Sequence, residues 1–187
     1  MQETGGKEKE MTIEITKKGT REFYKEVVNV TSQYRQLLVK PDGKLSDNFK
    51  KNILLTVAMA IFFVTDLYIG ITSGFRMGII LPMVLAVMAS VAMIIYLKRL
   101  NDMVNGYLED DRPATVTLDD EGVEIARKDA QAIRLAWDNV AFVRVFGEST
   151  CFFSKDLSGI VLAVTNDHRK EIMEYLKEND HGVRVIK

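Results

Sequence analysis

Two apolar stretches decide the fold: residues 53–71 read ILLTVAMAIFFVTDLYIGI, and residues 77–97 read MGIILPMVLAVMASVAMIIYL. A hydrocarbon core about 30 Å thick is crossed by roughly 20 apolar residues of helix, at about 1.5 Å per residue. Only residues 72–76 lie between the stretches, so the two helices must be antiparallel neighbours. A buried hairpin in a soluble core is the alternative, but the rest of the chain is too short to cover both helices. The sequence predicts a transmembrane helical hairpin over residues 53–97.

Basic residues at the ends of the hairpin predict its orientation. Lys50 and Lys51 precede the first apolar stretch and Lys98 and Arg99 follow the second, whereas the connecting loop carries Arg76 alone. An excess of Lys and Arg near the ends of a span marks the cytoplasmic side. We therefore expect both termini in the cytoplasm and the loop outside. The first stretch also begins too far along the chain to be an ordinary secretory signal peptide, so we expect no cleavage.

The residues before the hairpin divide into a tail and a folded segment. Residues 1–10 (MQETGGKEKE) are polar and glycine-bearing, which predicts a disordered tail. Over residues 11–50 we expect a short strand and then an amphipathic helix that begins after Thr20 as its N-cap and extends to about residue 39. One face of that helix carries apolar side chains at helical spacing: Phe23, Val27, Val30, Tyr34 and Leu37. The protein's own soluble domain, the membrane surface or a partner helix would have to cover this face.

The pattern changes after the hairpin from helical period to strand period. Residues 98–111 extend the second span as a connecting helix, with Pro113 as its stop signal. Residues 112–187 then show apolar alternation interrupted by polar turns. The expected strands are 115–118, 123–126, 133–137, 140–146, 150–154 and 159–164, followed by a helix over 167–180 that Asn166 can cap. The predicted fold class is an α+β membrane protein: a two-helix transmembrane hairpin followed by a small antiparallel β-barrel or sheet, capped by a C-terminal helix.

Two short segments carry a resemblance to a known family: TLDDEGV at residues 117–123 and LAWDNV at residues 135–140. Antiparallel strands followed by one capping helix resemble a pleckstrin-homology-like domain. Together with the preceding hairpin and the N-terminal strand and helix, this layout resembles the YcxB-like family of bacterial membrane proteins. The chain departs from that family's pattern at residues 164–166, where Val-Thr-Asn stands in place of a proline. The resemblance implies the fold and a multi-pass location in a bacterial plasma membrane, not an activity.

Asp66 is the one charged residue within the two apolar stretches. A carboxylate at this depth costs roughly 2.5 to 3.5 kcal/mol on insertion scales, so it needs a partner or a proton. Hairpin geometry puts it opposite Pro82, whose missing N–H leaves the carbonyl of Gly78 free to accept from a protonated Asp66. An ionised Asp66 could instead pair with Arg76. We interpret Asp66 and Arg76 as candidate intramembrane contacts, within the hairpin or in a homo-oligomer, with a proton or ion relay as the alternative.

Charge and composition exclude several classes of function. Residues 1–52 hold 11 basic and 8 acidic side chains, a net of +3, and residues 98–187 hold 13 and 17, a net of −4. Neither segment has the concentrated basic character that binding to nucleic acid requires. Cys151 is the only cysteine, so no intrachain disulfide is possible, and two histidines do not make a metal-ligand set. We expect no nucleic acid, no metal and no cofactor.

No pairing of nucleophile and base can be assembled from the sequence, so we expect no catalytic residues and no enzyme. We expect Cys151 to be a small buried residue of the core. His168 and His181 lie near the two ends of the last predicted helix. The acidic residues 119–121 lack the ligand pattern of a calcium loop and predict a solvated turn. Trp137 is expected in the core, with a peptide groove as the alternative.

Three classes of function remain. The favoured one is a non-catalytic, membrane-anchored cytoplasmic module that binds a protein partner or supports a membrane assembly, with Trp137 marking the candidate partner groove. The second is a lipid-headgroup or small-ligand sensor, and the third is a transport accessory subunit, for which Asp66 is the only indication. Pleckstrin-homology domains that hold phosphorylated headgroups generally have a basic first hairpin, as the resemblance implies. The acidic turn at residues 119–121 argues against that ligand.

Overall fold

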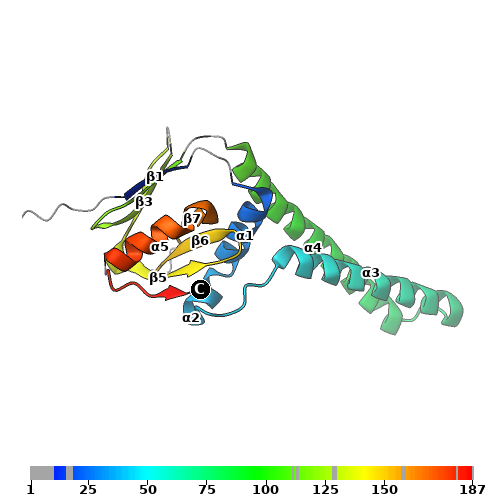
Figure 1. The fold of residues 1–187 in the computed structure, drawn as a ribbon. Helices are drawn as coiled ribbons and strands as arrows, with labels where there is room; N and C mark the ends of the chain where they lie inside the picture. The colour runs from blue at the N-terminus through cyan, green and yellow to red at the C-terminus, as the bar shows by residue number, and fades with distance from the viewer. Residues whose placement is uncertain are drawn as a thin grey trace, which may run out of the picture. The chain divides into compact units, whose positions relative to one another are not determined.

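The computed structural model describes residues 11–15, 19–110, 112, 114–127, 130–156, 159–179 and 181–186. They fall into two compact units (Figure 1). The hairpin unit is Ser46–Gly106, and the sheet unit combines Met1–Leu45 with Tyr107–Lys187. The N-terminal and C-terminal segments, which the hairpin separates in sequence, therefore form one folded body.

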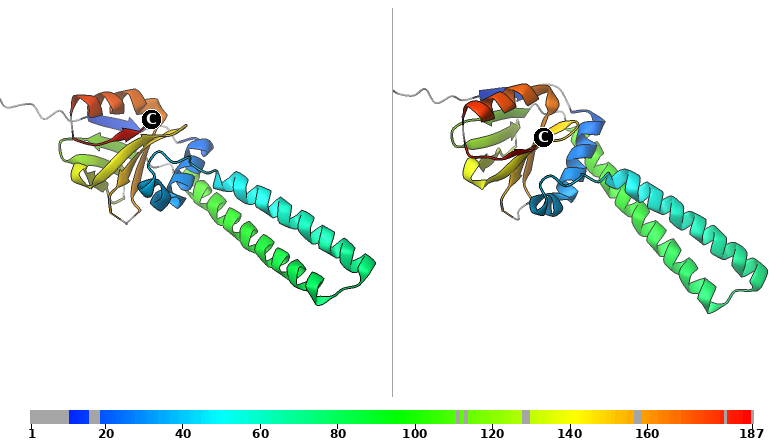
Figure 2. Two further views of the ribbon diagram at one scale, coloured as in Figure 1. Left: turned by 90° about the horizontal axis from the view of Figure 1, so that it is seen from below. Right: turned by 60° about the horizontal axis from the view of Figure 1, so that its bottom comes forward.

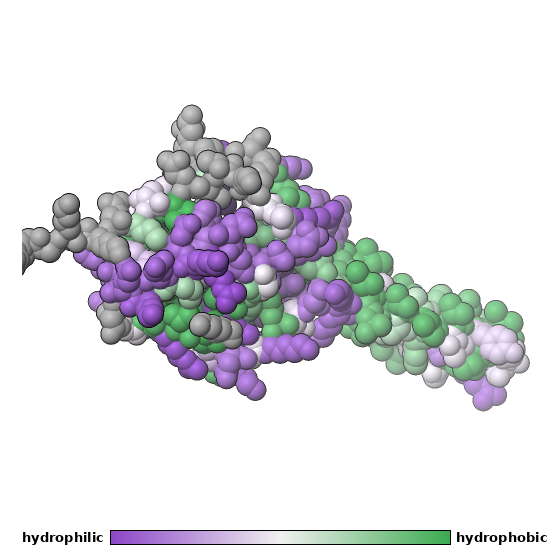
Figure 3. Space-filling view, in the orientation of Figure 1, coloured by the Kyte–Doolittle hydropathy of each residue, from purple (hydrophilic) through white to green (hydrophobic). Residues whose placement is uncertain are grey.

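The hairpin unit contains two long helices, α3 (Asn48–Ser73) and α4 (Met77–Glu109), of which the last three residues belong to the sheet unit. Asp47 caps α3 by accepting from the backbone N–H of Lys50 at 3.1 Å. Both helices are long and apolar enough to cross a membrane, and only 6% of the most apolar window of each is buried. Their side chains are mostly hydrophobic at the surface (Figure 3). The expectation of two long apolar helices joined by a short loop is confirmed.

The first sheet of the sheet unit is antiparallel and has the strand order β1-β2-β3-β4. Its strands are β1 (Met11–Ile15), β2 (Ala114–Leu118), β3 (Gly122–Arg127) and β4 (Ile133–Ala136). Met11 lies opposite Leu118 and Ile13 opposite Val116, so β1 pairs with a strand about a hundred residues away. The N-terminal strand is therefore an edge strand of the C-terminal sheet.

The second sheet has the order β7-β6-β5-β8. It contains β5 (Val140–Val145), β6 (Ser149–Ser154), β7 (Val161–Thr165) and β8 (Val185–Ile186), the last of which runs parallel to β5. A 3-10 turn at Trp137–Asn139 leads the chain from β4 into this sheet. No described strand of one sheet pairs with a strand of the other. Of the two predicted alternatives, a small barrel or a sheet, the barrel is therefore wrong; the described strands form two sheets that are antiparallel except for the pairing of β5 with β8.

The main core lies between the two sheets and the last helix, α5 (Arg169–Glu178) (Figure 2). Phe152 of β6, Val116 of β2 and Ile172 of α5 are all fully buried in it. Ile172 and Tyr175 face inward, as their helical spacing predicts. The expected cap at Asn166 is not formed; its side chain instead donates to the carbonyls of Phe146 and Gly147 and holds the β5–β6 turn.

The opposite face of the second sheet is covered by α1 (Arg21–Ser32) and α2 (Tyr34–Val39), which together make up the predicted amphipathic helix. The hydroxyl oxygen of Thr20 accepts from the N–H of Phe23 at 3.1 Å, which confirms the N-cap. This second core contains Val30, Tyr34, Leu37, Phe142, Cys151, Phe153 and Ile186. Because both faces of the sheet are covered, all six residues of β6 are buried. The protein's own domain therefore covers the apolar face of the helix.

Candidate binding cavity

The sheet unit contains a cavity of about 350 Å³, a volume typical of small-ligand sites. Five elements contribute walls: the start of α1, the end of α4, the paired strands β3 and β4, and the edge strand β7. The lining residues are Phe23, Tyr24, Val27, Tyr107, Arg112, Ile125, Arg127, Ala130, Gln131, Ile133, Val161, Leu162 and Ala163. Most of these side chains are aromatic or aliphatic.

Aromatic rings form the wall of the cavity on the side of α1. The ring of Tyr24 stacks on that of Tyr107, with centroids 5.5 Å apart and planes at 7°. Phe23 meets Tyr24 edge to face at 5.1 Å. Gly19 permits this arrangement, since a Cβ at that position would lie 2.4 Å from the ring of Phe23. Such aromatic pairs are favourable beyond the area that they bury, so this wall is preformed.

Another wall is the edge strand β7. Val161, Leu162 and Ala163, three consecutive residues of that strand, all line the cavity. Because successive side chains of a strand point to opposite faces of the sheet, the cavity must run along the edge of the strand and not over one face. The N–H of Ser154 donates to Ile160 O and that of Asn166 to Glu148 O, each at 3.1 Å. In an antiparallel pair, successive residues direct their backbone N–H and C=O groups alternately toward the neighbouring strand and away from it. Counting from these two hydrogen bonds, Leu162 directs its groups toward β6 and Ala163 directs its groups away from β6. Backbone N–H and C=O groups at Ala163 therefore border the cavity.

Two arginines and one glutamine supply the polar part of the lining. Asp110 accepts from Arg112 at 2.8 Å and from Arg127 Nη1 at 2.6 Å, so a single carboxylate bridges both guanidinium groups. Hydrogen bonding from Arg112, reinforced by the charges of both arginines, holds the pKa of Asp110 well below its usual range. Asp110 is therefore ionised at neutral pH and fixes the two arginines beside the cavity.

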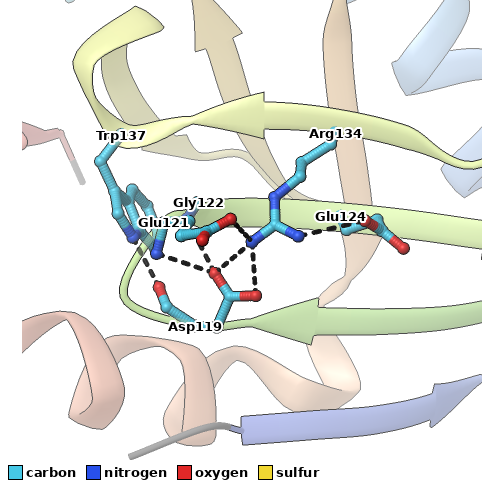
Figure 4. A network of polar contacts seen from close by, with 6 residues as sticks. All are labelled: Asp119, Glu121, Gly122, Glu124, Arg134 and Trp137. Atoms are coloured by element: carbon cyan, nitrogen blue, oxygen red, sulfur yellow. Dashed lines mark hydrogen bonds and ion pairs between the residues drawn. The ribbon is translucent and has the colours of Figure 1, made fainter. Parts of the chain in front are cut away.

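Trp137, the predicted marker of a partner groove, lies elsewhere. Its side chain is only 6% exposed, and its Nε1 donates to the backbone carbonyl of Asp119 at 2.7 Å (Figure 4). The indole stacks on the ring of His181 at 4.4 Å and 9°. It belongs to the main core and does not line the cavity, so it offers little surface to a partner.

The acidic turn at residues 119–121 is an organised polar network (Figure 4). The carboxylate of Asp119 accepts from the N–H groups of Glu121 and Gly122 at 2.9 Å each and from Arg134. Burial raises the pKa of Asp119, but these hydrogen bonds and the Arg134 charge outweigh it, so the pKa is lowered. Gly122 allows the close approach of β4, since a Cβ there would lie 2.4 Å from Leu135 O. Within the described residues no group of three or more His, Cys, Asp or Glu could hold a metal ion.

Asp66 and Arg76 are not joined by an ion pair in the described part of the chain. One carboxylate oxygen of Asp66, Oδ2, is buried and has no hydrogen-bond partner there, and Arg76 lies exposed beyond the end of α3. The helices instead meet through contacts such as Thr56 Oγ1 to Met93 Sδ at 3.7 Å. The predicted donation to the carbonyl of Gly78 is not seen.

The remaining candidate residues occupy structural positions. Burial raises the pKa of the Cys151 thiol to about 12, and its Sγ lies 3.4 Å from Ser149 Oγ. His168 Nδ1 lies 3.4 Å from Glu171 Oε2 at the start of α5. Cys151 fills the core between the second sheet and the two N-terminal helices, as its flanking phenylalanines suggest.

Sequence reasoning missed the cavity because its walls come from separate segments, of which α1 lies about eighty residues or more before all the others. The signals that could have indicated it are Tyr24, an aromatic residue beside the main apolar stripe of α1, and Arg127 at the end of a strand. Neither residue is informative without the other. The resemblance to the YcxB-like family stays a prediction. Comparison of the chain with protein-family models, with curated proteins and with solved structures found no match.

Proposed function

We propose that this protein is a non-catalytic binding module anchored in the plasma membrane by the α3–α4 hairpin, with the sheet unit in the cytoplasm. One observation carries the proposal: the most apolar windows of both helices are only 6% buried. A helix of this composition in a soluble core would be mostly buried. Exposed apolar area on this scale calls for lipid or a partner to cover it.

The flanking charges support the orientation. Lys50 and Lys51 lie in the first turn of α3, while Lys98 and Arg99 lie in the C-terminal half of α4. With those ends in the cytoplasm, the sheet unit lies on the same side, because its two segments adjoin the two outer ends of the hairpin in sequence. In that location it would bind a protein partner or support a membrane assembly.

A second candidate function, a small-ligand sensor, is favoured by the cavity itself. Its volume and its mainly apolar lining fit a small ligand better than the buried Trp137 fits a peptide. Both candidates place the binding event in the sheet unit and require no reaction.

Cysteine labelling in intact cells tests the anchor and its orientation. In a Cys151→Ala background, Ser73→Cys should react with a thiol reagent that cannot cross the inner membrane, because Ser73 ends α3 at the loop. Asp120→Cys, at an exposed position in the sheet unit, should react only after the cells are opened. The reverse pattern would overturn the orientation, and recovery of the protein in the soluble fraction would overturn the anchor.

A further inference from the structure

We propose that the cavity between α1 and the edge of β7 binds a single-chain anionic amphiphile, with its headgroup at Arg112 and Arg127. This inference rests on the binding role proposed above and names the chemistry of the ligand. The apolar chain would lie against Tyr24, Tyr107 and Ala163, and a carboxylate or a comparable monoanion would meet the guanidinium groups. Three steps lead to it.

The first step is the shape and lining of the cavity. A volume of about 350 Å³ suits a small ligand and is far too small for a folded partner. Phe23, Tyr24 and Tyr107 present rigid rings whose mutual stacking is already formed, so a ligand does not have to order them. Preorganised apolar walls favour an aliphatic or aromatic body over a polar one.

The second step is the sign of the charge. Among the described residues that line the cavity, the charged ones are Arg112 and Arg127, both cationic, and Asp110 pairs with each of them. An anionic headgroup would be attracted to these two guanidinium groups, whereas a cationic headgroup would be repelled.

The third step is the hydrogen-bonding capacity of Arg127. A guanidinium carries five N–H donors in a planar fork. Within the described residues Arg127 uses Nη1 for Asp110, and its side chain is 35% exposed. Its other donors can therefore bind a carboxylate while Asp110 holds the group in place, and such charge-assisted hydrogen bonds are the strong ones.

Photolabelling of the full chain in nanodiscs of neutral lipid tests the inference. The probe is octanoate with a diazirine near its chain end, and labelled peptides are mapped by mass spectrometry. We expect label on the start of α1, on β7 or on both. An excess of unlabelled octanoate should compete, whereas octanol and octyltrimethylammonium should compete at least about tenfold less well, since a hydrogen bond to a charged group is worth about one to two orders of magnitude in affinity.

Two variants and one control sharpen the test. Arg127→Gln should weaken labelling of the cavity roughly tenfold, and Ala163→Leu should reduce it by filling the space. Arg169→Gln, at an exposed position on α5 outside the cavity, should leave labelling unchanged. Circular dichroism shows whether each variant is folded, and the competition series on the unaltered protein decides the question even if a variant is not.

The outcomes separate this inference from the function on which it rests. Label confined to α3 and α4 would mean that the probe only partitions into the bilayer, and it would overturn the inference while leaving the anchor intact. Equal competition by octanol would overturn the anionic headgroup. Displacement of bound probe by an acidic peptide but not by free octanoate would assign the cavity to a protein ligand and overturn the amphiphile. Loss of the protein from the membrane fraction would contradict the anchor, which is measured separately.

Discussion

Nη2 of Arg134, on β4, lies 2.7 Å and 2.6 Å from the two carboxylate oxygens of Asp119 in the β2–β3 turn (Figure 4). The same carboxylate accepts two backbone N–H groups of the turn, and the backbone carbonyl of Asp119 accepts from the indole of Trp137. One residue therefore ties the turn to β4 and to the main core. The acidic side chain of Asp119 therefore has a structural role in this turn.

Replacing Asp119 should destabilise the sheet unit. Asp119→Ala removes the acceptor of two backbone N–H groups and should lower the free energy of unfolding by about 1 to 3 kcal/mol. The matched control is Asp120→Ala, next along the same turn and exposed, which should change it by less than about 0.5 kcal/mol. Denaturant titration of the full chain in detergent, followed by circular dichroism, measures both, and equal effects would contradict the assigned role.

The contribution of Asp119 should depend on pH in a defined direction. Its pKa is lowered in the folded protein, so its contribution is present above the ordinary carboxyl pKa of about 3.9 and is lost as the pH falls through the lowered value. The stability difference between the unaltered protein and Asp119→Asn should therefore shrink as the pH falls below about 4. A difference that stays constant over this range would exclude the ionised carboxylate as its source.

Two buried tyrosines should respond in opposite ways to removal of the hydroxyl. Tyr34 donates to the carbonyl of Ser154 at 2.7 Å, so Tyr34→Phe should cost about 1 kcal/mol. The hydroxyl of Tyr175 is buried without a partner among the described residues, so Tyr175→Phe should be neutral or stabilising. Thermal unfolding of both variants under one condition tests the contrast, and a larger loss for Tyr175→Phe would contradict it.

Alkaline titration gives an independent measure of the burial of Tyr175. Burial raises its pKa to about 12, with Asp120 and Asp119 adding to the shift. Because the folded pKa exceeds the ordinary value of about 10, the unfolded chain loses this proton first, so the folded state loses stability as the pH rises from about 10 toward 12. Tyr175→Phe should flatten the loss of stability over this interval, as measured by denaturant titration at successive pH values. An unchanged slope would show that other groups cause it.

Residues 107–187 should not fold without the N-terminal segment. That fragment lacks β1, the partner of β2, and it also lacks α1 and α2, which cover Cys151 and Phe153. We expect no cooperative thermal transition from it and exposed apolar surface that binds a hydrophobic dye. A chain that joins residues 1–45 to residues 107–187 through a flexible linker should unfold cooperatively. Cooperative unfolding of the short fragment would show that the N-terminal segment is dispensable.

Asp66→Asn should preserve membrane insertion and any cellular phenotype. One carboxylate oxygen is already buried without a partner among the described residues, and an amide can occupy the same space without a charge. Membrane levels are measured by immunoblot of the membrane fraction, with Thr65→Ala as a neighbouring control. Loss of a phenotype at unchanged membrane levels would make the relay the better interpretation of Asp66.

The sequence alone determined several features that depend on local pattern, although the expected cap at Asn166 was not among them. Apolar length over residues 53–71 and 77–97 implied two long helices, because helix rise relates residue number to length. The side chain of Thr20 identified the start of α1, since a hydroxyl there can accept an otherwise unpaired N–H. Alternation and helical spacing identified β2, β3 and the inward face of α5.

Only the tertiary structure decided what each apolar face packs against. Periodicity shows that Tyr34 and Leu37 need a cover, but not that Phe153, more than a hundred residues later, supplies it. The same holds for β1 with β2, for Arg134 with Asp119, and for the cavity that Tyr24 and Arg127 share. These contacts depend on which distant surfaces fit together when the whole chain is packed, and packing is a property of volume and shape that a one-dimensional pattern does not contain.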